Sequence, residues 1–132
     1  TITPLLCRYS ERKLIKPERI EKILISASKQ SLKAFVPKLN PMTPYTDFMN
    51  SVTEPHRFIA HCYEAEKMHL LHACPPHSDV VVLVGPEGDF SLDEVRLALD
   101  NNFKAVTLGS SRLRTETAGV VACHLVTVVN SL

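Results

Sequence analysis

The residues with the greatest chemical capacity lie close together near the end of the chain. Arg112, Arg114 and Glu116 follow an apolar run that ends at Gly109. Two guanidinium groups can bind a phosphate or stabilise negative charge on a nucleobase, and a carboxylate can accept a proton. Two alternatives stay open. Arg112 and Arg114 could be a solvated surface pair, and Thr115 and Glu116 could serve as the N-cap and first turn of a helix.

A second segment of this kind joins an apolar run, residues 80–84, to a predicted helix. It contains Gly85 and Gly88 together with Glu87 and Asp89. Glycine at the end of a strand lets the backbone turn sharply and lets a ligand approach the main chain. The spacing matches neither the dinucleotide fingerprint nor a P-loop, and the two carboxylates would repel phosphates. We therefore expect a ligand that is neutral or cationic here, such as a nucleoside carrying a sulfonium and an amino acid.

Histidine and cysteine crowd between positions 61 and 77, which raises the question of a zinc site. Zinc ligands usually recur in frames such as Cys-x-x-Cys or His-x-x-x-His, and this segment has neither. We predict polar loop histidines and no metal. The cysteines are expected to be free thiols in a reducing cytoplasm, because none forms a Cys-x-x-Cys pair. The residues concerned are His61, Cys62, His69, His72, Cys74 and His77, with Cys7 and Cys123 elsewhere.

The elements around the two loops are strands followed by helices. Residues 80–84 form a continuous apolar run, which is typical of a strand buried on both faces of a parallel sheet. Ser91 and Glu94 form a capping box that starts the next helix, and residues 104–108 form the next strand. A final helix over 116–131 is apolar almost all round, so a second subunit is expected to cover part of it.

The first half of the chain is expected to add two strands and two helices. A short strand over residues 2–9 leads to a polar turn over 10–13. An amphipathic helix begins at Pro17, because apolar residues recur from there at intervals of three and four. The remaining predicted elements are a short helix over 46–50, a strand over 57–60, and a loop with one helical turn over 63–78.

This alternation predicts an α/β fold, a mainly parallel sheet with helices on both faces. In such sheets, the loops at the carboxyl ends of the strands form the ligand crevice. The 132 residues suffice for one domain, with 45% hydrophobic residues, 22% charged residues and a net charge of +1. A charge this small argues against binding nucleic acid through the overall field, so the positive charge is local or supplied by another domain. No apolar run approaches the roughly 18 residues of a membrane span, no signal-peptide pattern is present, and the start at Thr1 favours a piece of a longer protein.

Two motifs resemble the paired signature of the RsmE-type 16S ribosomal RNA uridine-N3 methyltransferases of the SPOUT superfamily. They are the segments 85–94 and 108–118, and residues 27–37 also resemble the family's pattern, so the resemblance covers essentially the whole chain. Asp89 departs from the pattern, which has a second glycine there. Ser110 and Ser111 stand where a bulkier or basic residue is frequent.

The resemblance implies S-adenosylmethionine as cofactor, held in a bent conformation by the backbone of three loops. It also implies a C-terminal trefoil knot, a cytoplasmic homodimer with the active site at its interface, and 16S ribosomal RNA or the small ribosomal subunit as partner, with no membrane or DNA. Residues 1–132 would be the methyltransferase domain, without the N-terminal PUA-like RNA-binding domain of full-length members. The implied cofactor-binding residues are Ala60, His61, Cys62, Val84, Gly85, Pro86, Gly88, Leu108, Gly109, Leu113 and Thr115.

The implied reaction is methyl transfer to uridine N3, a nitrogen that must lose its proton. Arg112 and Arg114 would stabilise the anionic base or hold its phosphate, and Glu116 would be the candidate proton acceptor. The target base would leave its stack to reach the pocket. Three alternatives stay open: a SPOUT methyltransferase with another RNA target, a non-catalytic module that binds cofactor or RNA, and an α/β enzyme that binds ATP or NAD.

Overall fold

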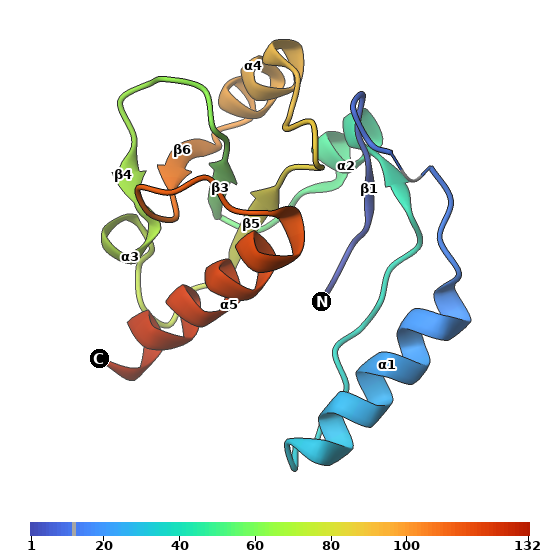
Figure 1. Cartoon of the computed structure of the whole chain (residues 1–132). Helices are drawn as coiled ribbons and strands as arrows, with labels where there is room; N and C mark the ends of the chain where they lie inside the picture. The colour runs from blue at the N-terminus through green and yellow to red at the C-terminus, as the bar shows by residue number, and fades with distance from the viewer. Residues whose placement is uncertain (12) are drawn as a thin grey trace.

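The computed structural model describes residues 1–11 and 13–132. The predicted turn over residues 10–13 includes Arg12, which lies outside the described residues. The chain forms a small and a larger sheet with helices around them (Figure 1). In chain order the elements are β1 (Leu5–Leu6), α1 (Pro17–Gln30), β2 (Thr43–Pro44), α2 (Tyr45–Ser51), β3 (His56–Ala60), β4 (Met68–His69), α3 (Leu70–Ala73), β5 (Val80–Val84), α4 (Leu92–Asp100), β6 (Lys104–Thr107) and α5 (Thr115–Ser131).

The larger sheet is parallel, as the continuous apolar run over residues 80–84 predicts. Its strand order is β4-β6-β3-β5, and Ile59 of β3 pairs with Leu83 on one side and Ala105 on the other. The smaller sheet pairs β1 with β2, also in parallel. Since β6, β3 and β5 are neighbours and run the same way, their carboxyl ends meet at one edge of the sheet.

Helices cover both faces of the larger sheet, which confirms the predicted fold class. Along β3, Phe58 packs into a cluster with Leu70 of α3 and Ala122 of α5, while Ile59 packs into another cluster with Ala98 of α4. Successive strand residues point to opposite faces, so α4 and α5 lie on opposite sides of the sheet (Figure 1). Complete burial of a side chain of this size contributes about 1.5–3 kcal/mol.

Sequence signals predict the starts of α1, α4 and α5, and the structure agrees for α1 and α4. Pro17 opens α1, and the Ser91 hydroxyl accepts from the Glu94 amide at 3.1 Å while the Glu94 side chain accepts from the Ser91 amide at 2.8 Å. The predicted capping box of α4 is therefore confirmed. For α5 the expectation is wrong: the cap position is Arg114, and Thr115 is the first helical residue.

The segment over 63–78 contains the predicted helical turn, α3, and a strand that the sequence did not predict. Met68 and His69 form β4, which pairs with the free edge of β6. His69 then caps α3, because its Nδ1 atom accepts from the Leu71 amide at 3.1 Å. A strand of two residues is too short to show any periodicity, so no pattern could reveal it.

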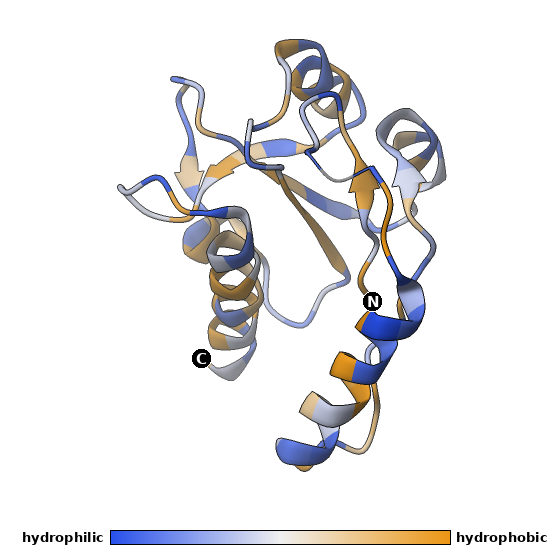
Figure 2. Cartoon of the chain, turned by 45° about the vertical axis from the view of Figure 1, so that its right-hand side comes forward, coloured by the Kyte–Doolittle hydropathy of each residue, from blue (hydrophilic) through white to orange (hydrophobic). Residues whose placement is uncertain are grey.

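Helix α1 stands apart from the larger sheet and carries both hydrophilic and hydrophobic residues (Figure 2). Its residues Ile23 and Ile25 are 58% and 43% exposed. The segment that follows exposes Leu32 and Phe35 as well. In the described part of the chain, no helix is both long and apolar enough to cross a membrane.

Candidate functional site

A cavity of about 820 Å³ opens where β3, β5 and β6 end, and it is the candidate site. Its volume is in the range of pockets that bind small molecules. The structure brings together every residue predicted for the site except Gly88. The predicted residues that line it are Ala60, His61, Cys62, Val84, Gly85, Pro86, Leu108, Gly109, Arg112, Leu113, Arg114, Thr115 and Glu116.

Gly88 lies outside this lining and has a different reason to be glycine. A Cβ atom at this position would lie 2.8 Å from Cβ of Tyr9, closer than real side chains approach. The residue therefore allows the loop after β5 to pack against the N-terminal segment. Its contribution to the cavity is indirect, through the position of that loop.

Gly85 and Gly109 do contribute backbone to the cavity. A Cβ atom on Gly85 would lie 3.1 Å from Oδ1 of Asp89 and 3.2 Å from the ring of Phe90, so the space is already occupied on that side. Gly109 has φ of 151°, which side chains disfavour, and a Cβ there would meet no atom within 4 Å. The backbone at Gly109 is therefore open to a ligand.

The hydroxyl of Thr115 joins two of the loops. It donates to the carbonyl of Gly85 at 2.8 Å, across 30 positions of sequence. A capping side chain would instead accept from a backbone amide, which explains why the predicted cap does not form. The start of α5 is thereby fixed against the loop after β5.

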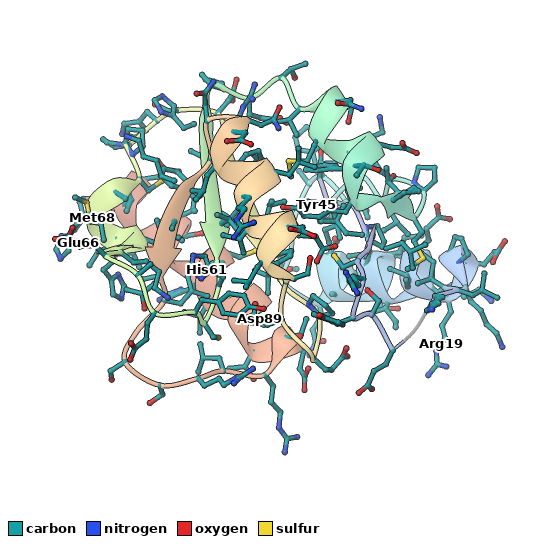
Figure 3. The ribbon with its side chains drawn as sticks, turned by 90° about the horizontal axis from the view of Figure 1, so that it is seen from above. Arg19, Tyr45, His61, Glu66, Met68 and Asp89 are labelled. Atoms are coloured by element: carbon teal, nitrogen blue, oxygen red, sulfur yellow. The ribbon has the colours of Figure 1, made fainter. Side chains whose placement is uncertain are left out.

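Asp89 joins the loop after β5 to the loop after β3. It lies in the loop between β5 and α4 (Figure 3), has φ of 64° and is 9% exposed. Its carboxylate accepts from the amide of Cys62 at 2.9 Å and from the amide of Phe90 at 2.7 Å. Both oxygen atoms are thus engaged by backbone donors. Asp89 thus has a structural role besides its charge, and the expectation that it repels phosphate stays a prediction, as it does for Glu87, an exposed carboxylate of the lining.

His61 lies at the inner wall, where it is 7% exposed. Among the described residues its Nδ1 atom is buried without a hydrogen-bond partner. Burial lowers the pKa of His61, the nearby charge of Lys67 lowers it further, and Asp89 opposes both. A pKa below the ordinary value leaves the ring neutral near neutral pH.

Lys67 holds the first loop in shape and was missed by the sequence reasoning. Its ammonium group donates to the carbonyl of His61 at 2.6 Å and to the carbonyl of Tyr63 at 3.0 Å. The hydroxyl of Tyr63 donates in turn to the carbonyl of Phe90 at 2.7 Å. A lysine several residues beyond a strand gives no local signal of such a role.

Three charged residues lie at the outer part of the cavity. Arg112, Arg114 and Glu116 are all exposed, next to the half-buried Thr115. The site thus combines a charged rim with an inner wall of backbone, His61, the buried Asp89 and the half-buried Lys67. Such an arrangement can enclose a nucleoside-sized ligand and present two cations to a second, anionic substrate.

The histidines and cysteines of the 61–77 segment are dispersed over several structural roles. His69 caps α3, the amide of His77 donates to Asn130 at 2.7 Å, and Cys74 is buried. Within residues 1–11 and 13–132, no group of three His, Cys, Asp or Glu side chains is placed to hold a metal ion.

Comparison with known proteins identifies a family and several relatives. The family model of the RNA methyltransferase domain matches residues 1–127. Ribosomal RNA small subunit methyltransferase E of Rickettsia conorii is 32% identical over 133 residues, which cover 98% of this chain and 54% of the relative. The chain spans about half the length of the curated relatives it matches.

Two solved structures have the same fold. The crystal structure of a probable rRNA-methyltransferase from Porphyromonas gingivalis matches with a TM-score of 0.90 and 42% identity, over 96% of this chain and 55% of that one. The crystal structure of a ribosomal RNA small subunit methyltransferase E from Neisseria gonorrhoeae, bound to S-adenosyl methionine, matches with a TM-score of 0.77 and 28% identity, over 92% and 53%.

Proposed function

This chain belongs to the RNA methyltransferase domain family, and on that basis we propose that it transfers a methyl group from S-adenosylmethionine to uridine N3 of 16S ribosomal RNA. The observation that carries the proposal is the meeting of three loops around one cavity with Arg112 and Arg114 at its rim. The names of relatives support ribosomal RNA of the small subunit as the substrate, since the Rickettsia conorii and Neisseria gonorrhoeae proteins are both named ribosomal RNA small subunit methyltransferase E.

The residues present fit S-adenosylmethionine. The cavity is large enough for a nucleoside with an amino-acid tail, and its inner wall presents backbone from the ends of three strands. Gly109 leaves the main chain open, and Nδ1 of His61 is a buried polar atom in need of a partner. When bound, the cofactor supplies an electrophilic methyl group. We assign its binding to the lining residues predicted from the sequence, with Gly88 acting through the position of its loop.

The roles of the rim residues follow from the charge that develops on the base. Uridine N3 forms a bond to the methyl carbon as the carbon–sulfur bond breaks, and the N3 proton leaves. Arg114 and Arg112 stabilise negative charge on the base or hold its phosphate, because a guanidinium is permanently charged and presents several donors. Glu116 is the proposed proton acceptor; it lies in the first turn of α5 and at the cavity.

The additional length of the relatives leaves room for a further domain in the whole protein. We propose that residues 1–132 are the methyltransferase domain and that a PUA-like domain contributes RNA affinity, because a net charge of +1 gives little general attraction to RNA. The four free cysteines agree with a cytoplasmic protein. The trefoil knot stays a prediction from the resemblance.

We also propose a homodimer, supported by apolar side chains that are exposed in one subunit. Val120 of α5 is 70% exposed, and α1 and its following segment expose Ile23, Ile25 and Phe35. The rest of the exposed α5 face is polar or small, including Cys123 and His124, so α1 has the larger uncovered apolar surface. Light scattering after size exclusion should give twice the subunit mass; a single subunit mass at micromolar concentration would refute the dimer.

The test of the activity is methyl transfer by the whole protein to small ribosomal subunits or 16S ribosomal RNA that lacks the modification. Labelled methyl groups should appear as 3-methyluridine after digestion to nucleosides. Label in another nucleoside would indicate a different RNA target. Cofactor binding without any transfer would indicate a non-catalytic binding module.

A further inference from the structure

We infer that Asp89 is a positioning residue that fixes the loop after β3 against the loop after β5, so that both present their backbone to the cofactor in one arrangement. The inference rests on the proposed function for the identity of the ligand. It is drawn from the backbone conformation of Asp89, from the two hydrogen bonds of its carboxylate and from its burial.

The backbone of the loop after β5 turns at Asp89. The amide of Asp89 donates to the carbonyl of Pro86 at 2.8 Å, and its φ of 64° lies in the left-handed region. Aspartate tolerates this region better than most residues, and glycine tolerates it without strain. Glycine would therefore suffice for the turn, so the turn alone does not account for an aspartate here.

The carboxylate makes the contacts that glycine could not make. Its Oδ2 atom accepts from the amide of Cys62 in the loop after β3, 27 positions away in sequence. Its Oδ1 atom accepts from the amide of Phe90 and lies where a side chain on Gly85 would have to stand. One buried side chain thus connects Cys62, which lines the cavity, to the loop after β5, which contributes Gly85 and Pro86 to the same lining.

Hydrogen bonds from backbone amides to a carboxylate are among the strong ones in proteins. Because Asp89 is nine-tenths buried, water competes little for these two hydrogen bonds. Thr115 fixes the third loop to the carbonyl of the same Gly85. The three loops are therefore connected by two side chains, and the loop after β3 depends on Asp89. A preformed site avoids the cost of ordering its loops when the ligand binds.

The decisive variant is Asp89→Gly, since it keeps the left-handed turn and removes only the carboxylate. Two measurements are made on this chain: exchange of the Cys62 amide hydrogen by NMR without ligand, and the Kd for S-adenosylmethionine by calorimetry. We expect exchange at Cys62 to speed up and the Kd to rise, each by about tenfold, as is typical for a lost hydrogen bond to a charged group. Asp93→Asn is the matched control, because it removes one exposed charge from α4 and should change neither quantity.

The outcomes separate this inference from the proposed function. Unchanged exchange at Cys62 would overturn the connection between the loops, and faster exchange with an unchanged Kd would overturn its role in binding. If the wild type fails to bind S-adenosylmethionine, the proposed function fails, while the exchange measurement still shows whether Asp89 holds Cys62. Should Asp89→Gly not fold, Asp89→Ala also removes both acceptors, and an unchanged Cys62 exchange and Kd in that variant would refute the inference.

Discussion

At the scale of single residues, Arg114 carries the strongest functional assignment. It lines the cavity, is exposed, and occupies the cap position of α5 through its backbone rather than its side chain. Its guanidinium is therefore free to bind substrate, and its removal should leave the fold intact. The assignment concerns the transfer step, so its test must separate transfer from cofactor binding.

Arg114→Ala should lower methyl transfer by the whole protein about 100-fold or more, as the loss of a group that stabilises developing charge does. The melting temperature and the Kd for S-adenosylmethionine should stay unchanged. Arg96→Ala is the control, since Arg96 is exposed on α4 away from the cavity. Equal transfer rates for wild type and Arg114→Ala would refute the assignment.

Thr115→Val should weaken the connection between α5 and the loop after β5. The change removes the hydroxyl that donates to Gly85 and leaves that carbonyl without its partner. The expected loss is about 1 kcal/mol in the free energy of unfolding. Urea unfolding measures it, and Thr117→Val, at an exposed neighbouring position, should cost clearly less. A cost equal at both positions would contradict the role of the Thr115 hydroxyl.

His61 should make stability depend on pH in the acid range. Burial lowers its pKa in the folded state, so below the ordinary value of about 6.5 the unfolded chain binds a proton that the folded chain does not. Stability therefore rises with pH through this window and is lost as pH falls below it. The free energy of unfolding, measured with urea at several pH values between 5 and 7.5, should rise less steeply with pH for His61→Gln than for wild type. His124→Gln, at an exposed position of α5, should keep the wild-type slope; equal slopes for wild type and His61→Gln would contradict the effect of burial.

At the scale of elements, the sequence predicts what local patterns determine. The run Val80–Val84 reads as a strand because all its side chains are apolar, and Ser91 with Glu94 reads as a helix start because both partners lie within four residues. The expected burial of this strand on both faces is wrong, because β5 lies at the sheet edge and only Leu83 is fully buried. The roles of Asp89 and Thr115 escape such reasoning. Their partners Cys62 and Gly85 are 27 and 30 positions away, and only the completed sheet brings them together.

The capping box gives an element-scale prediction. Ser91→Ala removes the acceptor for the Glu94 amide and should cost about 1 kcal/mol of unfolding free energy. Glu94 would keep its other bond, from the amide of Arg8 at 3.0 Å. Chemical denaturation of Ser91→Ala beside Ser110→Ala, a change in an exposed loop, checks the effect. No difference between the two variants would contradict the importance of the cap.

At the scale of the whole molecule, the α/β class and the place of the site follow from the order of strands and helices. Three neighbouring parallel strands end at one edge, and 13 of the 14 residues predicted for the site line the cavity there, with Gly88 as the exception. The sequence could not show how α5 presents its surface, because packing against the sheet hides its apolar face and leaves residues such as Cys123 and His124 outside. Four exposed apolar side chains, those of Ile23, Ile25, Leu32 and Phe35, lie on α1 and the segment that follows it.

The most direct test of the central claim is calorimetric titration of this chain with S-adenosylmethionine, with ATP and NAD as comparison ligands. S-adenosylmethionine should bind at about one site per subunit, with no comparable heat from ATP or NAD, because the carboxylates of Glu87 and Asp89 line the cavity and disfavour phosphates. Tighter binding of ATP or NAD, or no binding of S-adenosylmethionine to the folded protein, would contradict the claim.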